Sequence, residues 1–224
     1  MDGGPSSVDI LLATYNGARF VEAQIESLLQ QTYPGIRLLV HDDGSSDATL
    51  AILRRFAAQS PGKVLLVDGG RTNLGTSGSF SFLLEHASAD YVMFSDQDDV
   101  WQRSKVEATL RRMRQIECAG GADCPILVHT DMAVVDEHLR MLSPSFWAYQ
   151  RLDPQRGASL KRLLVQNVVT GCASMINRAL LRKAMPIPPG VMHDGWLALV
   201  AAVFGRLECL RRSTMLYRQH SGNQ

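Results

Sequence analysis

The first half of the chain alternates four times between a short apolar run and a segment with helical periodicity. The apolar runs span residues 8–14, 36–41, 64–67 and 91–95. The helical segments after them span residues 18–31, 47–59, 79–87 and 104–117. Apolar strands joined by amphipathic helices form βαβ units, so the sequence predicts an α/β fold with a parallel sheet and crossover helices. Ser46 is the expected N-cap of the second helix.

The second half of the chain lacks this regularity. Residues 126–135, 172–176 and 214–217 predict strands, and residues 194–204 predict a helix that ends at Gly205. Residues 141–156 mix proline, serine and aromatic side chains and predict a long loop. No repeat or linker divides the chain. We therefore expect one domain over residues 1–224, with a regular half (8–116) and an irregular half (117–224).

Composition and charge exclude several classes of protein. The chain has 23 basic and 22 acidic residues, and nucleic-acid binding usually needs a strong basic excess. The longest apolar run, residues 196–204, is too short to span a bilayer. Residues 1–7 carry no secretory signal. The four cysteines form no C-x-x-C pair, which argues against a zinc knuckle or a redox motif and predicts free thiols in a reducing cytoplasm.

Acidic residues gather in the loop after the fourth apolar run. Ligands of parallel sheets bind at the carboxyl ends of the strands, where loops begin at Thr14, His41, Val67 and Ser95. The loop after Ser95 contains Asp96, Asp98 and Asp99. Carboxylates this close repel one another unless a cation lies among them, and Mg²⁺ or Mn²⁺ prefers oxygen ligands. The alternative is a solvated acidic turn that caps the next helix.

Three other positions have two interpretations each. Asp42 and Asp43 precede Gly-Ser, which is ordinary turn chemistry, although Asp43 could also accept a hydrogen bond from a pyrimidine ring N–H. Asn73 suits a loop in any case. Asp194 precedes an apolar helical stretch and is either a helix N-cap or a carboxylate base. The helix start would lower its pKa, whereas burial by Trp196 and an acceptor would raise it.

Together and in this order, these motifs resemble those of the family 2 inverting glycosyltransferases with the GT-A fold, in particular their rhamnosyltransferase-like branch. The matching segments are residues 13–16, 42–47, 73–75, 96–101, 166–172, 177–178, 193–199 and 217–220. The resemblance covers nearly the whole chain from Val8 onward. One departure is Gly195, where the family commonly has an aromatic residue, and it puts the shape of the acceptor pocket in question.

The resemblance implies roles for individual residues. Nucleotide binding would fall to Ala13, Thr14, Tyr15, Asn16, Asp43, Asn73 and Asp96. Asp98 and His220 would bind a divalent metal, Mn²⁺ or Mg²⁺, and Asp194 would be the catalytic base. Further contacts would come from Asp42, Asp99, Trp196 and Arg218. Residues 8–116 would bind the nucleotide sugar and residues 117–224 the acceptor.

The activity that the resemblance implies is metal-dependent, inverting sugar transfer from a pyrimidine nucleoside-diphosphate sugar. The donor would be a dTDP- or UDP-sugar, with L-rhamnose as the first candidate. The acceptor would be a glycan or lipid-linked saccharide of bacterial cell-surface polysaccharide synthesis, on the cytoplasmic side of the membrane. Peripheral membrane contact would fit such an acceptor, although no amphipathic anchor is visible in the sequence.

Two other functions stay open. A sugar nucleotidyltransferase would need a Gly-rich phosphate loop followed by basic residues near the N-terminus, and the first loop holds only Gly17 and Arg19. A degenerate relative would bind a sugar nucleotide without turning it over. The intact acidic positions disfavour this second alternative, whereas Gly195 keeps it open.

Overall fold

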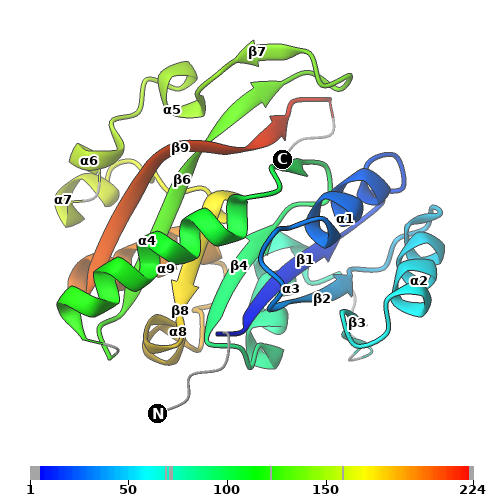
Figure 1. The fold of residues 1–224 in the computed structure, drawn as a ribbon, viewed down its shortest axis with the longest axis horizontal. Coiled ribbons are helices and arrows are strands. Elements are labelled where there is room, and N and C mark those ends of the chain that lie inside the picture. The colour runs from blue at the N-terminus through cyan, green and yellow to red at the C-terminus, as the bar shows by residue number, and fades with distance from the viewer. Residues whose placement is uncertain (1–5, 69, 71–72, 122, 158, 222–224) are drawn as a thin grey trace.

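One mixed β-sheet organises the part of the chain that the computed structural model describes, residues 6–68, 70, 73–121, 123–157 and 159–221 (Figure 1). Gly69, Arg71 and Thr72 of the third predicted loop lie outside the described residues. The strands are β1 (Val8–Thr14), β2 (Ile36–Asp42), β3 (Val64–Leu66), β4 (Tyr91–Ser95), β5 (Val100–Trp101), β6 (Ile126–Val135), β7 (Met141–Ser143), β8 (Ser174–Asn177) and β9 (Arg206–Arg218). Their order in the sheet is β3-β2-β1-β4-β8-β6-β9-β5, and β7 pairs with β6.

The predicted parallel half is confirmed. Strands β1, β2, β3 and β4 pair in parallel, and the bounds of β1 and β4 agree with the sequence prediction. The helices in this half are α1 (Val21–Leu29), α2 (Thr49–Gln59), α3 (Gly75–His86) and α4 (Lys105–Gly120). Beyond β4 the sheet is mixed: β8 is antiparallel to β4 and β6, whereas β9 runs parallel to β6.

Helices cover both faces of the sheet. One core lies under α1, α2 and α4, and the other lies under α3, α8 (Arg178–Ala184) and α9 (His193–Phe204). Successive residues of β1 serve the two cores in turn: Ile10 faces the first and Leu11 the second, as the two-residue period of a strand requires. Burial on both faces explains the apolar run that predicted β1, in which Asp9 is the one charged residue.

The structure corrects several expectations. Residues 141–156 are not one long loop, because they contain β7, α5 (Phe146–Tyr149) and the start of α6 (Pro154–Gly157). Strand β9 is much longer than residues 214–217, because it follows β6 along almost its whole length. A 3₁₀ turn, Gly171–Ala173, precedes β8.

Two predicted helix starts are also wrong. Helix α3 begins at Gly75, four residues before the expected start. Ser46 does not cap α2. The Asp47 carboxylate instead accepts hydrogen bonds from the backbone N–H and the hydroxyl of Thr49.

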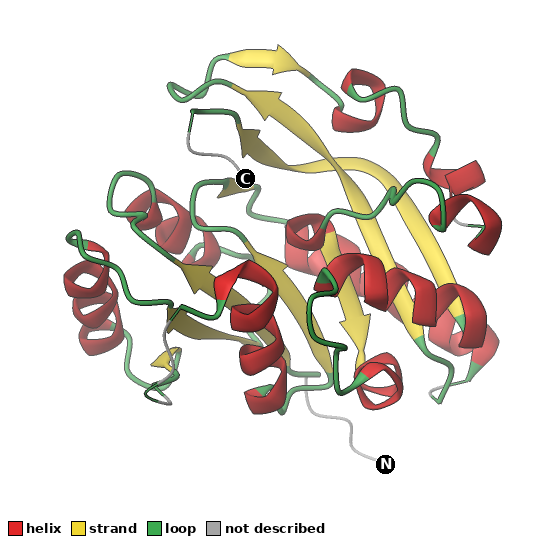
Figure 2. Cartoon of the chain, turned by 180° about the vertical axis from the view of Figure 1, so that it is seen from behind, coloured by secondary structure: helices red, strands yellow, loops and turns green. Residues whose placement is uncertain are grey.

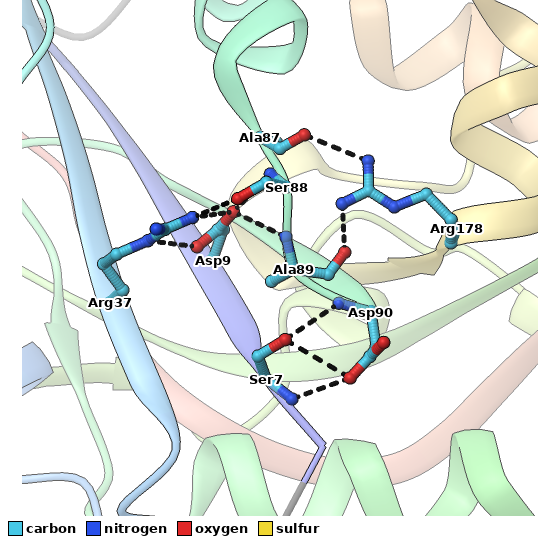
Figure 3. Close-up of polar contacts among 8 residues, drawn as sticks. All are labelled: Ser7, Asp9, Arg37, Ala87, Ser88, Ala89, Asp90 and Arg178. Carbon is cyan, nitrogen blue, oxygen red and sulfur yellow. Dashed lines mark hydrogen bonds and ion pairs between the residues drawn. The ribbon is translucent and has the colours of Figure 1, made fainter.

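A charged network closes the amino end of the parallel strands (Figure 3). Asp9 on β1 is 1% exposed, and its carboxylate forms a two-pronged ion pair with Arg37 on β2, with both N···O distances 2.9 Å. Its Oδ2 also accepts the backbone N–H groups of Ser88 and Ala89. Arg178, at the start of α8, donates to the carbonyls of Ala87 and Ala89. Among the described residues, the buried carboxylate of Asp9 is therefore satisfied by an ion pair and by backbone N–H groups.

Part of the irregular half forms one outer edge of the molecule. Strand β7 and the short helices α5, α6 and α7 (Leu160–Leu163) run along one side, away from β3 and α2 (Figures 1 and 2). Leu163 of α7 packs into the same core as Leu197 of α9. Among the described residues, no helix is long and apolar enough to cross a membrane.

Candidate active site

The loops after β1 and β2 are joined to each other. Thr14 is buried, and its hydroxyl donates to the carbonyl of His41 and to the carboxylate of Asp42. Asn16 adopts a positive φ of 47°, and its side-chain oxygen accepts the backbone N–H of Ser46. Three of the residues predicted to bind a nucleotide or lie near it, Thr14, Asn16 and Asp42, thus hold the two loops together. Ala13 lies directly before them at the end of β1.

Gln97 ties the β1 loop to the acidic loop. Its side-chain amide accepts the backbone N–H of Tyr15 at 2.9 Å and donates to the carbonyl of Tyr15 at 3.0 Å. Gly17 permits this approach, because a Cβ at that position would lie 2.1 Å from Oε1 of Gln97. Tyr15, whose backbone Gln97 holds, remains 51% exposed.

Asp43 connects β2 with the start of α3. Its carboxylate oxygens accept the backbone N–H groups of Leu74 and Gly75 at 2.7 and 2.8 Å, an arrangement that the helix dipole favours. The carbonyl of Asp43 accepts the N–H of Asn73, whose φ is 59°. Asp43 therefore orders the loop that contains Asn73. Its second predicted role, contact with a base, is not tested by these hydrogen bonds.

The acidic loop after β4 holds three carboxylates in three different environments. Asp99 is fully buried, and Oδ1 accepts the backbone N–H of Arg218, whereas Oδ2 has no hydrogen-bond partner among the described residues. Burial and the charges of Asp96 and Asp98 raise its pKa well above the ordinary value. Burial also raises the pKa of Asp96 to about 6, and the negative charges of Asp98 and Asp194 act in the same direction.

His220 contacts Asp98, although the two residues lie 122 positions apart in the chain. Nε2 of His220 lies 2.8 Å from Oδ2 of Asp98. Both side chains are largely buried, with exposed fractions of 13% and 16%. The imidazole packs against Phe20, just before α1, with ring centroids 4.8 Å apart. The structure thus brings together the two residues predicted as metal ligands.

Arg218 holds this end of β9 in place. Its Nε donates to the carbonyl of Asp98 at 2.7 Å and its Nη1 to the carbonyl of Glu137 at 2.6 Å. The guanidinium also lies over the ring of Phe20, 4.5 Å from the centroid. The further contact with the ligand that the resemblance implies for Arg218 stays a prediction. The observed hydrogen bonds give it a positioning role, since it fixes the acidic loop next to His220.

A buried cation lies beneath the acidic loop. Lys105 at the start of α4 is fully buried, and its Nζ donates to the carbonyl of Cys172 at 2.6 Å and lies 4.1 Å from the centroid of the Trp101 ring. Burial lowers the pKa of Lys105 to about 8, and the charges of Asp99 and Asp96 oppose this shift. Lys105 thus partly offsets the negative charge of the loop.

The donor atoms at this edge suit a hard divalent cation. Ligand atoms of Asp96, Asp99 and Cys172 lie within 4.8 Å of one another. Burial and the neighbouring carboxylates raise the pKa of the Cys172 thiol, so it remains protonated and is a poor metal ligand. Carboxylate oxygens and the imidazole of His220 remain, and this donor set accepts Mn²⁺ or Mg²⁺. The orphaned Oδ2 of Asp99 indicates that the protein alone does not satisfy the cluster.

Asp194 faces the same cluster from α9. The helix begins at His193, so Asp194 lies in its first turn and is not the N-cap. Its Oδ1 accepts the backbone N–H of Gly195. Burial raises the pKa of Asp194, and hydrogen bonds from backbone N–H groups only partly oppose this effect. Of the two opposing influences expected from the sequence, burial therefore dominates.

Two neighbours fix the start of α9. His193 is 3% exposed and packs against the rings of Phe80 and Phe94, so it is a core residue. Trp196 donates its indole N–H to the carbonyl of Ala184 on α8. Its ring system therefore anchors α9 to α8.

Sequence reasoning missed four residues of this site: Phe20, Gln97, Lys105 and Cys172. Only Lys105 left a usable signal, because it shares a buried helical stripe with Thr109 and Met113 at a spacing of four residues. A lysine on such a stripe needs a buried partner. The other three depend on contacts between segments far apart in the chain.

Comparison with known proteins places these observations in a family. The profile described as "Glycosyl transferase family 2" matches residues 9–184. The dTDP-rhamnosyl transferase RfbG of Shigella flexneri is 25% identical over 225 residues, covering 95% of this chain and 73% of its own. Over the first three curated relatives, the chain spans 46% to 73% of the relative's length.

Two solved structures share the fold. TarS 1-349 of S. aureus, in complex with UDP-GlcNAc, has a TM-score of 0.70 at 18% identity and covers 97% of this chain and 60% of its own. The mannosyltransferase PcManGT of Pyrobaculum calidifontis, in complex with GDP-Man and Mn²⁺, has a TM-score of 0.70 at 20% identity and covers 96% of this chain and 57% of its own. These similarities show the GT-A fold.

Proposed function

The chain belongs to glycosyl transferase family 2, and from this premise we propose that it transfers a sugar from a nucleoside-diphosphate sugar to a hydroxyl of a saccharide acceptor, with inversion and with a divalent metal. The observation that carries the proposal is the contact between Asp98 and His220, whose Oδ2 and Nε2 atoms lie 2.8 Å apart. Asp96 of the same acidic loop and Asp194 lie close enough for their charges to interact. Carboxylate and imidazole ligands for the diphosphate metal and a separate carboxylate base are the groups this reaction needs.

The reaction breaks the bond between C1 of the donor sugar and the diphosphate oxygen. Negative charge gathers on the leaving diphosphate, and a bound Mn²⁺ or Mg²⁺ would supply the Lewis acid that stabilises it. Asp98 and His220 would hold that ion, with Asp96 and Asp99 behind them. The orphaned oxygen of Asp99 and the raised pKa of Asp96 support this assignment, because both show carboxylates without sufficient positive charge nearby.

Asp194 would take the proton from the acceptor hydroxyl as its oxygen attacks C1 from the face opposite the leaving group. A positioned carboxylate contributes roughly 10²- to 10⁴-fold to such a step. Burial raises the pKa of Asp194 and makes the ionised form a stronger base. One base and one metal suffice, and no covalent intermediate is needed. Gly195 places no side chain next to this base, and the acceptor would enter there.

For the donor we propose a deoxythymidine- or uridine-linked sugar, with L-rhamnose as the first candidate. The name of the Shigella relative and the UDP-GlcNAc complex of TarS support a pyrimidine base, whereas PcManGT was solved with GDP-Man. The base would lie against the exposed ring of Tyr15, near Asp43. We propose bacterial cell-surface polysaccharide synthesis at the inner face of the cytoplasmic membrane as the setting. The names of further relatives, which include diphosphoundecaprenol glucosyltransferases, support a lipid-linked acceptor.

Thermal unfolding with a panel of nucleoside diphosphates, with and without Mn²⁺, tests the proposal. The panel contains UDP, dTDP, GDP and ADP. A ligand at 100 times its Kd stabilises the folded state by about 2.7 kcal/mol, which is easily measured. We expect a Mn²⁺-dependent shift with a pyrimidine diphosphate, followed by release of that diphosphate from the matching sugar nucleotide. A shift without turnover would favour a degenerate binding domain, and no shift in a folded sample would refute the proposal.

A further inference from the structure

The exposed apolar side chains are concentrated on one edge of the molecule. Among the described residues, eleven large hydrophobic side chains are exposed, and seven of them lie within residues 139–165. These seven are Leu139, Met141, Leu142, Tyr149, Leu160, Leu164 and Val165. They belong to β7, α5, α7 and the turns beside them, which run along the outer edge in both views (Figures 1 and 2). We call residues 139–165 the edge segment.

The same segment is basic in a chain that is nearly neutral. It contains five basic residues and one acidic residue, whereas the whole chain has 23 basic and 22 acidic residues. Lys161 and Arg162 are exposed on α7 between exposed Leu160 and the exposed pair Leu164 and Val165. Basic side chains interleaved with apolar ones are complementary to a surface with negative charges on the outside and an apolar layer beneath them. An anionic lipid bilayer has this combination.

Helix α7 also places this surface next to the candidate base. Leu163 is buried in the core that contains Leu197 of α9, so the helix is fixed to the molecule while Val165 remains 89% exposed. Two residues later, the amide of Asn167 would lie 3.7 Å from a Cβ on Gly195. Val165 therefore lies two residues before Asn167, which is next to Gly195, the neighbour of Asp194 in the first turn of α9.

We propose that the edge segment docks the protein on an anionic membrane surface, with Leu164 and Val165 entering the headgroup region and Lys161 and Arg162 meeting lipid phosphates. Docking itself does not depend on the transferase activity. Its consequence, that a lipid-linked acceptor reaches Asp194 from the bilayer, rests on the proposed function.

Co-sedimentation with vesicles of phosphatidylcholine alone and of phosphatidylcholine with phosphatidylglycerol tests the proposal. We expect the wild type to sediment with the anionic vesicles and to be released by high salt. Leu164→Ser with Val165→Ser should lower the partition coefficient about tenfold, because each side chain loses part of its apolar burial. Lys161→Glu with Arg162→Glu should lower it by more than tenfold, because each basic residue near an anionic surface contributes about 1 kcal/mol.

Val203→Ser is the matched control, since Val203 is 51% exposed but lies outside the edge segment. It should bind vesicles as the wild type does. No sedimentation of the wild type with anionic vesicles, or equal losses in the control and the Leu164/Val165 variant, would overturn the proposal. So would a wild-type dimer in sedimentation velocity that the Leu164/Val165 variant converts to a monomer, because the edge would then be an interface between copies. Nucleotide-induced thermal shifts, measured in parallel, report separately on the proposed function.

Discussion

The two ends of the parallel strands bury carboxylates in opposite ways. At the amino end, Asp9 accepts four hydrogen bonds, two from Arg37 and two from backbone N–H groups. At the carboxyl end, Oδ2 of Asp99 is buried without a hydrogen-bond partner among the described residues, and the pKa of Asp96 is raised to about 6. Burying an unpaired charge is unfavourable. The first arrangement completes the fold, and the second leaves a buried carboxylate oxygen without a partner, where the proposed metal would bind.

The largest effect should come from Asp98→Asn. Removing the carboxylate that meets His220 would deprive the leaving group of its metal, which is worth several kcal/mol, or roughly 10³-fold in turnover. His220→Ala should follow in the same direction with a smaller loss. Release of nucleoside diphosphate against Mn²⁺ concentration measures both variants.

Asp90→Asn is the control for this prediction, because Asp90 hydrogen-bonds Ser7 at the amino end of the strands. Its turnover should match that of the wild type. If the Asp98→Asn variant keeps full, Mn²⁺-dependent turnover, Asp98 is not a metal ligand, and the carboxyl end of the strands does not hold a metal in the way proposed.

Asp194→Asn should lower kcat by about 10²- to 10⁴-fold without a comparable loss of stability. In the wild type, activity should rise with pH as Asp194 loses its proton. Because burial raises the pKa of Asp194, this rise should lie above the ordinary aspartate value of about 3.9. The pH profile of kcat measures both effects. An unchanged acid limb in the variant would assign the base to another residue.

The sequence predicted the amino half of the sheet well, because residues 8–14 and 91–95 are largely buried on both faces and mostly apolar, with Asp9 as the one charged residue among them. It missed most of β9, since the first residues of that strand, Arg206–Ser213, alternate irregularly between charged and apolar side chains and are partly exposed. Their strand conformation comes from pairing with β6, a long-range contact that local periodicity does not encode.

The candidate site shows the same limit. The residue types at the strand ends were predictable, because carboxylates crowded after a buried strand are unusual. The contact between Asp98 and His220 joins positions 122 residues apart, and only the resemblance to a family suggested it. The partners of Arg218, the carbonyls of Asp98 and Glu137, were not predictable either, because an arginine's partners cannot be identified from its neighbours in the sequence.

At the paired end, Asp9→Ala should destabilise the fold by about 3 kcal/mol. Arg37 and two backbone N–H groups would lose their acceptor, and breaking a buried pair from one side typically costs about 3–5 kcal/mol. The lower value is appropriate because the Arg37 side chain is 35% exposed. Urea unfolding measures the loss, and kcat per folded molecule should stay unchanged. A loss of activity larger than the loss of folded protein would link this end to the reaction.

The smallest effect should come from Gly17→Ala, which tests the hydrogen bonds between Gln97 and Tyr15 at the carboxyl end of the parallel strands. A Cβ at this position would lie 2.1 Å from Oε1 of Gln97, so Gln97 must move and its two hydrogen bonds to Tyr15 weaken. Each such bond contributes about 1 kcal/mol, which predicts a loss of about 1–2 kcal/mol and a several-fold weaker affinity for the nucleotide. If Gln97 is the only obstacle, Gly17→Ala should cost much less in a Gln97→Ala background, because the bonds are already absent there. Equal losses of stability in both backgrounds would mean that the backbone conformation at position 17 itself requires glycine. The two hydrogen bonds between Gln97 and Tyr15 would then contribute little to the site.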